Sequence, residues 1–340
     1  MLVALCGCTS MFEKGSVRFS AAAVNSGAQT RVKYDDDFTD DDSKDYVRLD
    51  WGRGDQILIT SNYAATDDDA HSATYAVTNI DEKIGTTLGR YSYGSLSPVG
   101  KELLWNEIYR KDQHEFWSIH PVTGATLDEN GTFTATIPSQ TTISQQNPYL
   151  WMVAHVPTGT IKNEAGKTIS LYFFPVFTDV RLELNHDTSI TEEVTLQSCE
   201  LSSTDGTLLS GSFSAMIATE GQNESNGITS YLPDSGSTTA ATTCNGLTIN
   251  PEGGSPEKID IICLPFSTDK DIRLTCNFTI GTMSYSKYLT ISGSKFHPRL
   301  QHRLKALVLP SDLKLIDFEV VSCGQESDES HHHQLPGITF

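Results

Sequence analysis

Apolar and polar residues alternate along Ile272-Arg273-Leu274-Thr275-Cys276-Asn277-Phe278-Thr279-Ile280, which is the longest such run in the chain. Successive side chains of a β-strand point to opposite faces, so the run predicts a strand with one face on a core and the other in water. The thiol of Cys276 falls on the inward phase, where a small apolar residue fits.

The same alternation recurs from Tyr46 onward. It is found in four further segments: Phe133–Ile137, Val180–Leu184, Phe213–Ile217 and Ile316–Val320. Turn-forming residues separate such segments, as at Asp128–Gly131 and Asn250–Gly254. Only Gly100–Lys111 has the residue spacing of a helix. Many short strands without a strand–helix repeat predict an all-β protein built of β-sandwiches with Greek-key connections.

The length of 340 residues exceeds the ~100 to 200 residues typical of one domain, which favours two domains. We expect a truncated lipoprotein signal at 1–8 and an N-terminal pro-segment or detachable strand at 9–31, with a strand at Ser16–Ala22. An N-terminal β-sandwich domain at 32–172 and a C-terminal one with a polar tail at 173–340 complete the expected organisation.

The charge balance excludes some classes of partner. The chain carries 24 basic and 43 acidic residues, a net charge of -19, which argues against nucleic-acid binding and against a polybasic membrane patch. No stretch approaches the ~20 apolar residues of a membrane-spanning helix.

Motifs that carry catalysis are missing from the sequence. It contains no phosphate-binding glycine loop, no G-x-S-x-G and no H-E-x-x-H, so we expect no enzyme, cofactor or metal site. The remaining enzyme hypothesis is a pair of carboxylates brought together from distant positions. Arg53-Gly54-Asp55 could be an integrin-binding tripeptide, but Trp51 before it and Ile57–Ile59 after it favour a turn that leads into a buried strand.

The cysteines suggest a lipid anchor. Leu5-Cys6-Gly7 before Cys8 has the pattern of a lipobox, in which the Cys8 thiol carries a lipid that inserts into a membrane. Five cysteines would then remain: Cys199, Cys244, Cys263, Cys276 and Cys323. Five is an odd number, so at least one stays free, and any disulfide pairing among the others stays open.

Taken in order, these landmarks resemble the fimbrillin family of Bacteroidales-type lipoproteins, which includes the type V pilins. The resemblance covers nearly the whole chain, and its landmarks are the Cys8 lipobox, Phe19-Ser20-Ala21, Thr30-Arg31, Trp51-Gly52-Arg53-Gly54-Asp55, Phe116–Pro121, Ala135–Thr141 with Pro138, Leu150–Ala154 and Phe177–Leu182. It is weaker in the second half, where Arg299 follows Phe296-His297-Pro298 at a position at which glycine is usual.

The resemblance implies two transthyretin-like domains and assembly by strand exchange. A lipoprotein precursor would reach the outer membrane and cell surface, where an arginine- or lysine-specific protease removes the N-terminal segment. The vacated groove would then accept a strand from another fimbrial subunit. Arg31 is the expected cleavage residue, with Arg18 and Lys33 as alternatives.

The sequence thus predicts a structural and adhesive subunit of a surface fimbria. The tail from Gly324 is rich in Asp, Glu, His and Gly and would make a poor donor strand, which favours an accessory or tip-like subunit. The alternative is a monomeric surface lipoprotein that binds glycans or host ligands. In that case exposed tryptophans could stack on sugar rings, and the candidates are Trp51, Trp105, Trp117 and Trp151.

Overall fold

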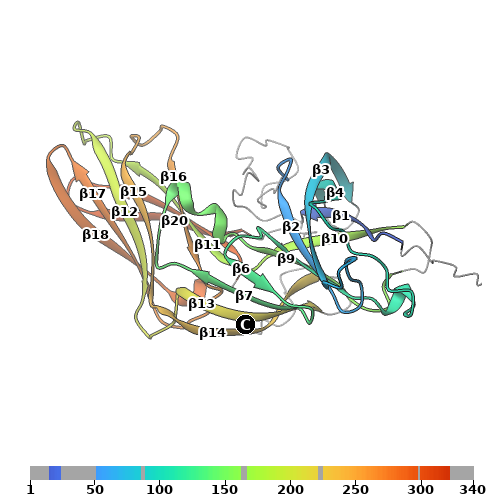
Figure 1. Ribbon diagram of the computed structural model, residues 1–340. Coiled ribbons are helices and arrows are strands. Elements are labelled where there is room, and N and C mark those ends of the chain that lie inside the picture. Colours follow the sequence, from blue (N-terminus) through green and yellow to red (C-terminus); the bar gives the residue numbers. More distant parts are fainter. Residues whose placement is uncertain are drawn as a thin grey trace, which may run out of the picture.

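The computed structural model describes residues 15–23, 51–85, 89–161, 167–220, 225–297 and 299–321. Across these ranges the regular structure consists of β-strands and a few single-turn 3-10 helices, so the predicted all-β class is confirmed. The molecule is elongated, with a barrel at one end and long twisted strands at the other (Figure 1).

Seven strands close the barrel in the order β1-β10-β9-β5-β2-β3-β4. Their bounds are β1 Arg18–Ala23, β2 Gln56–Ser61, β3 Ser72–Gly85, β4 Gly89–Pro98, β5 Phe116–His120, β9 Met152–Val156 and β10 Thr168–Pro175. Inward side chains such as Ile57, Tyr75 and Phe173 fill the interior with one hydrophobic cluster. Alternation along each strand thus gives a packed barrel rather than a pore.

Two sheets form a β-sandwich at the other end. The first has the order β16-β11-β19-β20 and the second the order β18-β17-β12-β15-β8. Their bounds are β8 Gln140–Thr142, β11 Thr178–His186, β12 Val194–Ser203, β15 Thr239–Thr248, β16 Glu257–Cys263, β17 Ile272–Ile280, β18 Met283–Ile291, β19 Gln301–Val308 and β20 Leu313–Val321. Both sheets contribute to one core, with Leu182 and Leu304 from the first and Leu201 and Leu274 from the second.

A fourth sheet runs along the middle of the molecule in the order β14-β13-β7-β6 (Figure 1). Its strands are β6 Ala125–Leu127, β7 Thr132–Ile137, β13 Ser210–Glu220 and β14 Ser225–Ser237. Its core includes Phe133 and Phe213 and also Ile119 and Val153, which lie on barrel strands β5 and β9. Strands from before and after residue 172 therefore share sheets, since β7 pairs with β13 and β8 with β15. The division into domains 32–172 and 173–340 stays a prediction.

The alternating segments lie where the sequence predicts strands. β17 spans Ile272–Ile280, and its residues alternate between buried and more exposed positions from Ile272 to Phe278. The other four segments fall within β7, β11, β13 and β20. The predicted strand at Ser16–Ala22 overlaps β1.

The helix suggested by Gly100–Lys111 is wrong. Leu104 forms bridges with Ser16 and Ala65, so its backbone is extended, and both Leu103 and Trp105 are buried beside it. The spacing of apolar residues here reflects two extended contacts with the barrel rather than one helical face. The described helices are single 3-10 turns: η1 Lys111–Gln113, η2 Ile143–Gln145, η3 Asn147–Tyr149 and η4 Gly293–Lys295.

Candidate functional site

Strand β1 fills a slot between two strands from distant parts of the sequence. It pairs in parallel with β10, from Arg18 opposite Thr168 onward, and antiparallel with β4, from Ser20 opposite Ser95 onward. With β1 in place the barrel is closed (Figure 1). Without it, β4 and β10 would each present an open edge of N–H and C=O groups.

Alternate side chains of β1 point into the barrel. Val17, Phe19 and Ala21 are buried in the barrel core. The Phe19 ring meets Tyr75 and Phe116 edge to face, at centroid distances of 5.2 and 5.1 Å. The slot is therefore an apolar groove that accepts a strand with side chains at every second position.

Ser20 and Ala22, on the other face of β1, are buried as well, and hydrogen bonds also hold the strand. Just before the strand, the Val17 N–H donates to Leu103 O at 2.9 Å. The Ser20 hydroxyl donates to Ser170 Oγ at 3.4 Å on the neighbouring β10. No ion pair joins β1 to the part of the chain that the structure describes. The sequence predicted the strand but not the groove around it. Tyr75 and Phe116 are far apart in the chain, and no local pattern shows that they line the same groove.

The predicted processing residues fall outside the described residues. Cys8 lies before residue 15, and Arg31 and Lys33 lie between residues 23 and 51. Arg18 is exposed on β1, where it is paired with β10. Arg31 therefore follows β1 in the sequence and precedes every other described strand.

Gly54 and Asp55 shape the turn that leads into β2. Gly54 has a positive φ of 89°, a conformation that favours glycine, and its N–H donates to Val77 O at 2.9 Å. Asp55 Oδ2 accepts a hydrogen bond of 2.7 Å from the Gly52 N–H. Because this carboxylate is buried and used within the turn, Arg53-Gly54-Asp55 matches the predicted turn rather than an integrin-binding tip.

The other landmark residues support the fold at separate places. The Trp51 ring packs edge to face against the ring of His120, with the centroids 5.1 Å apart. His120 directly precedes Pro121 in the sequence. Burial lowers the pKa of His120 to about 4, so this imidazole is neutral near pH 7. Pro138 follows the end of β7 and leads to β8 in another sheet. The structure places Trp51 against His120, the residue before Pro121, but the landmarks do not converge on one site.

The tryptophans proposed for sugar stacking are buried. Trp51 and Trp105 belong to the barrel core, while Trp117 and Trp151 belong to the core of the middle sheet. Each of the four is at most 8% exposed, so no ring face is free to stack on a sugar. A glycan site built on these four residues is therefore wrong.

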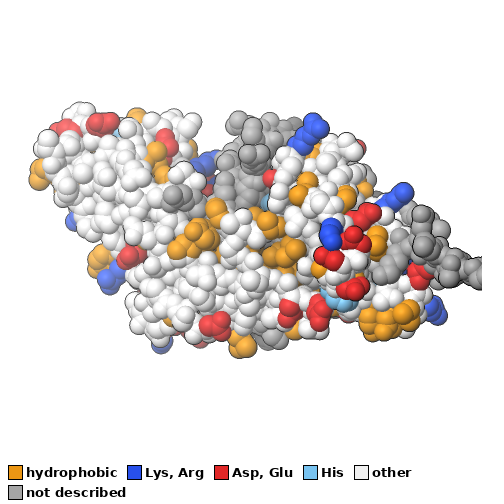
Figure 2. All heavy atoms as spheres, in the orientation of Figure 1, with side chains coloured by type: hydrophobic (Ala, Val, Ile, Leu, Met, Phe, Trp, Pro, Cys, Tyr) orange, Lys and Arg blue, Asp and Glu red, His pale blue; other side chains and the backbone are white. Residues whose placement is uncertain are grey.

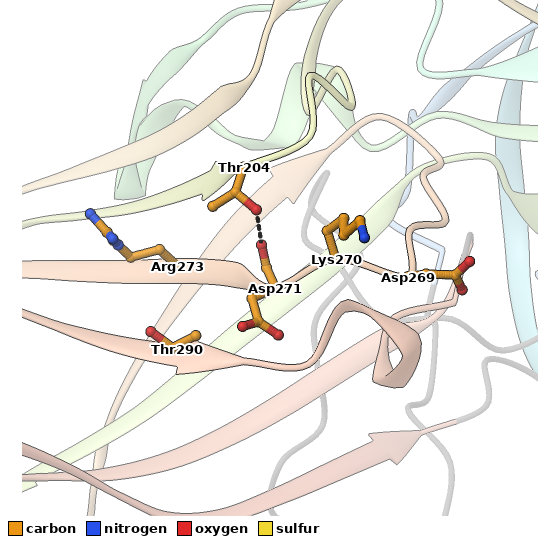
Figure 3. Close-up of a pocket in the computed structure, with 6 residues that line it drawn as sticks. All are labelled: Thr204, Asp269, Lys270, Asp271, Arg273 and Thr290. Carbon is orange, nitrogen blue, oxygen red and sulfur yellow. Dashed lines mark hydrogen bonds between the residues drawn. The ribbon is translucent and has the colours of Figure 1, made fainter.

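A surface pocket of about 430 Å³ lies at the start of β17. Figure 3 shows its lining residues: Thr204, Asp269, Lys270, Asp271, Arg273 and Thr290. The carboxylates of Asp269 and Asp271 point in different directions (Figure 3). The Arg273 guanidinium lies 4.3 Å from the centroid of the Tyr288 ring. These side chains do not meet at a common point, so the pocket does not have the geometry of an acid–base pair.

Three thiols lie on neighbouring strands of the sandwich. Cys199 Sγ is 3.6 Å from Cys276 Sγ across β12 and β17, and both cysteines are free, as are Cys244 and Cys263. Hydrogen bonds with Cys244 and Cys276, together with burial, hold the pKa of Cys199 well above its usual value. Burial also raises the pKa of Cys263. The thiols of Cys199 and Cys263 are therefore protonated. Cys276 is fully buried, as its phase along the strand predicted.

The described residues offer neither a metal site nor a helix that could span a membrane. Among the residues that the structure describes, no cluster of His, Cys, Asp and Glu could hold a metal ion. None of its described helices is long and apolar enough to cross a membrane.

Comparison with known proteins identifies the fold. No protein-family model and no curated protein matches the chain. A solved structure from Bacteroides uniformis, described as a "putative cell adhesion protein", is 14% identical with a TM-score of 0.54, over 91% of this chain and 98% of that one. One from Bacteroides ovatus with the same description is 16% identical with a TM-score of 0.53, over 92% and 99%. The shared fold supports the resemblance to fimbrillin-like proteins, and along nearly its whole length this chain has the fold of these two Bacteroides proteins.

Proposed function

We propose that the chain is a structural and adhesive subunit of a surface fimbria, of the type V kind, that assembles by strand exchange. The observation that carries this proposal is the position of β1 between β4 and β10. A strand at the very start of the described chain completes a barrel whose other strands lie beyond residue 55. The two Bacteroides proteins of the same fold are described in terms of cell adhesion, which supports the adhesive part.

Strand exchange needs a groove that another strand can fill. If β1 left, the N–H and C=O groups of β4 and β10 would lose their partners and the space of the Phe19 ring would open. A donor strand with apolar side chains at alternate positions would restore the hydrogen bonds and fill the space of the Phe19 ring. The closed barrel thus suits a subunit that exchanges its own strand for that of a neighbour.

Proteolysis would release β1. Cleavage after Arg31 would cut the covalent link between β1 and β2, so that only hydrogen bonds and apolar contacts held the strand. Arg18 lies within β1 itself, so cleavage there would divide the strand. We therefore propose Arg31 as the processing site for an arginine- or lysine-specific protease. Before processing, a lipid on Cys8 would anchor the precursor to the outer membrane at the cell surface.

We also propose that segments 32–172 and 173–340 are two transthyretin-like domains with Greek-key connections. The matching arrangement of β1 and β11, each parallel to one neighbour and antiparallel to the other, supports two related units rather than the exact boundary. Within the fimbria we place the chain as an accessory or tip-like subunit without catalytic activity, whose partners are other fimbrial subunits.

The processed form isolated from native cells tests this proposal. We expect high-molecular-weight material in which the chain starts at Val32, by N-terminal sequencing and intact mass. Arg31→Ala should leave an unprocessed monomer, whereas the matched control Arg53→Ala, at an exposed turn, should be processed normally. A strictly monomeric wild-type chain that still begins at acylated Cys8 would contradict strand exchange. It would favour the alternative, a monomeric surface lipoprotein that binds glycans or host ligands.

A further inference from the structure

A second surface pocket, of about 480 Å³, lies beside η1 in the barrel half of the molecule. Its lining includes Asn62, Tyr63, Arg110, Asp112, Gln113 and Thr158, which come from three separate loops. Figure 2 shows hydrophobic side chains gathered at this end of the molecule, at the lower right. Ile108, in the loop that leads into η1, is 87% exposed. None of the family landmarks lies in this pocket.

Two stacked tyrosines lie at this site: Tyr63 lines the pocket, and Tyr109 is stacked on Tyr63 beside it. The rings of Tyr63 and Tyr109 are nearly parallel, at 10°, with their centroids 3.8 Å apart. Tyr109 is 36% exposed. An exposed tyrosine offers both an apolar ring face and a polar hydroxyl to a ligand.

Hydrogen bonds hold the three loops in fixed positions. Asn62 Nδ2 donates to Gln113 O at 3.3 Å, and Asn62 Oδ1 accepts from the Glu115 N–H at 2.9 Å. From the third loop, the Gly159 N–H donates to Asp112 O at 2.6 Å. The pocket is therefore formed before any ligand arrives, which lowers the cost of ordering on binding.

Arg110 and Asp112 place donors and acceptors side by side. Arg110 Nη2 donates to Asp112 Oδ2 at 2.5 Å, and the Arg110 side chain is 72% exposed. Asp112 Oδ1 is buried and has no hydrogen-bond partner within the described residues. A guanidinium retains several further N–H donors beside the carboxylate. Adjacent hydroxyls of a sugar carry acceptor oxygens, so the remaining donors of Arg110, held in place by Asp112, are matched to a vicinal diol.

The charges at the pocket decide between neutral and acidic ligands. Arg110 is balanced by Asp112, and the nearby Glu115 adds a carboxylate that contacts His155 Nε2 at 2.6 Å. The whole chain carries a net charge of -19, which disfavours an anionic ligand. We propose that this pocket binds a neutral oligosaccharide, with one sugar ring stacked on Tyr109 beside the pocket and its hydroxyls bound by Arg110, which Asp112 holds in place.

This inference deepens the adhesive part of the proposed function by naming a ligand class and a site. It does not depend on strand exchange, since the pocket lies outside β1, β4 and β10. Measurements on the full, uncleaved monomer therefore separate the two proposals, and loss of glycan binding would leave fimbrial assembly untouched.

The test is a glycan array of neutral, sialylated and sulfated oligosaccharides probed with the full chain, followed by calorimetry on each glycan that binds. We expect neutral glycans to bind, and Tyr109→Ala and Arg110→Ala each to weaken binding about tenfold. The matched control is Tyr288→Ala, because Tyr288 is 55% exposed on β18 in the sandwich. That variant should change the affinity by less than about twofold.

Three outcomes would overturn the inference. They are the absence of binding to any glycan on the array, binding confined to acidic glycans, and unchanged affinity in Tyr109→Ala and Arg110→Ala. A protein ligand whose capture depends on Tyr109 without any glycan binding would also reject the ligand class. Thermal melts of the variants show whether they fold. If Tyr109→Ala does not fold, the affinity of Arg110→Ala decides the result.

Discussion

Strands β1 and β11 hold matching positions in the two halves of the molecule but are attached differently. β1 lies between β10 and β4, and β11 lies between β19 and β16, in each case parallel to the first neighbour and antiparallel to the second. β1 has six residues and β11 has nine. On β11, the Arg181 guanidinium donates to both carboxylate oxygens of Asp260 on β16, at 2.8 and 3.1 Å.

The difference indicates which strand can leave. Withdrawing β11 would strip Asp260 of its largely buried partner, and β11 follows β10 after only two residues. Losing one member of a buried ion pair is costly because the other charge stays desolvated. β1 is held to the described residues by backbone hydrogen bonds and apolar side chains, which an incoming strand can replace. Under the proposed strand exchange, β1 rather than β11 is therefore the strand expected to leave.

Breaking the ion pair of β11 should have the largest effect on stability. The Arg181 side chain is 3% exposed, so we expect Arg181→Ala to lower the free energy of unfolding by about 4 kcal/mol. Urea denaturation measures this. The control is Lys305→Ala, because Lys305 and Asp317 form an exposed pair at 3.7 Å that contributes less than about 1 kcal/mol. Equal effects of the two variants would remove the contrast between β1 and β11.

Removing the Phe19 ring from the barrel core should have the next largest effect on stability. Its buried ring contacts Tyr75 and Phe116, so Phe19→Ala should destabilise the uncleaved chain by about 3 kcal/mol. The matched control on the same strand is Arg18→Ala, at an exposed position, with an effect below about 0.5 kcal/mol. If Phe19→Ala were as stable as the wild type in urea, β1 would not be seated in the barrel core.

Acid should weaken both halves by similar amounts. Burial lowers the pKa of His120 in the barrel to about 4 and that of His302 in the sandwich to about 3. In the unfolded chain both have a pKa near 6.5, so below that pH the unfolded state binds more protons and stability falls. We expect a loss of about 2 kcal/mol per histidine between pH 7 and 5. His120→Gln and His302→Gln should each flatten this dependence, and a pH-independent wild type would show that neither is buried and neutral.

The smallest effect is expected at the thiols of the sandwich. Cys199, Cys244, Cys263 and Cys276 are buried, so a thiol reagent should not label them in the native protein within the time that labels them in urea. Peptide mapping after labelling distinguishes each position. Rapid native labelling of Cys199 or Cys276 would mean that the sheet opens around β12, against the firm attachment inferred for this half.

The sequence predicted the strands better than their partners. Alternation along Ile272–Ile280 is a local pattern, and β17 has those bounds. The pairing of Arg18 with Thr168 joins residues far apart in the chain, and nothing local specifies it. The helix prediction for Gly100–Lys111 failed for the same reason, because Leu104 forms bridges with residues that are far away in the chain. The pocket near η1 also depends on distant loops, although aromatic residues beside polar ones at Asn62-Tyr63 and Tyr109-Arg110 are the signal that could have indicated it.

A reversible staple between β1 and β10 tests the central claim most directly. Ser20 and Ser170 are opposite each other with their hydroxyl oxygens 3.4 Å apart, so Ser20→Cys/Ser170→Cys places two thiols where a disulfide can form. Each single variant is the control, and all are treated with an arginine-specific protease before size-exclusion chromatography. We predict that, mixed with fimbrial subunits sheared from native cells, the cleaved wild type and single variants enter high-molecular-weight fractions, whereas the oxidised double variant stays monomeric until dithiothreitol releases β1. Entry of the oxidised double variant into these fractions as fast as the wild type would contradict the exchange of β1.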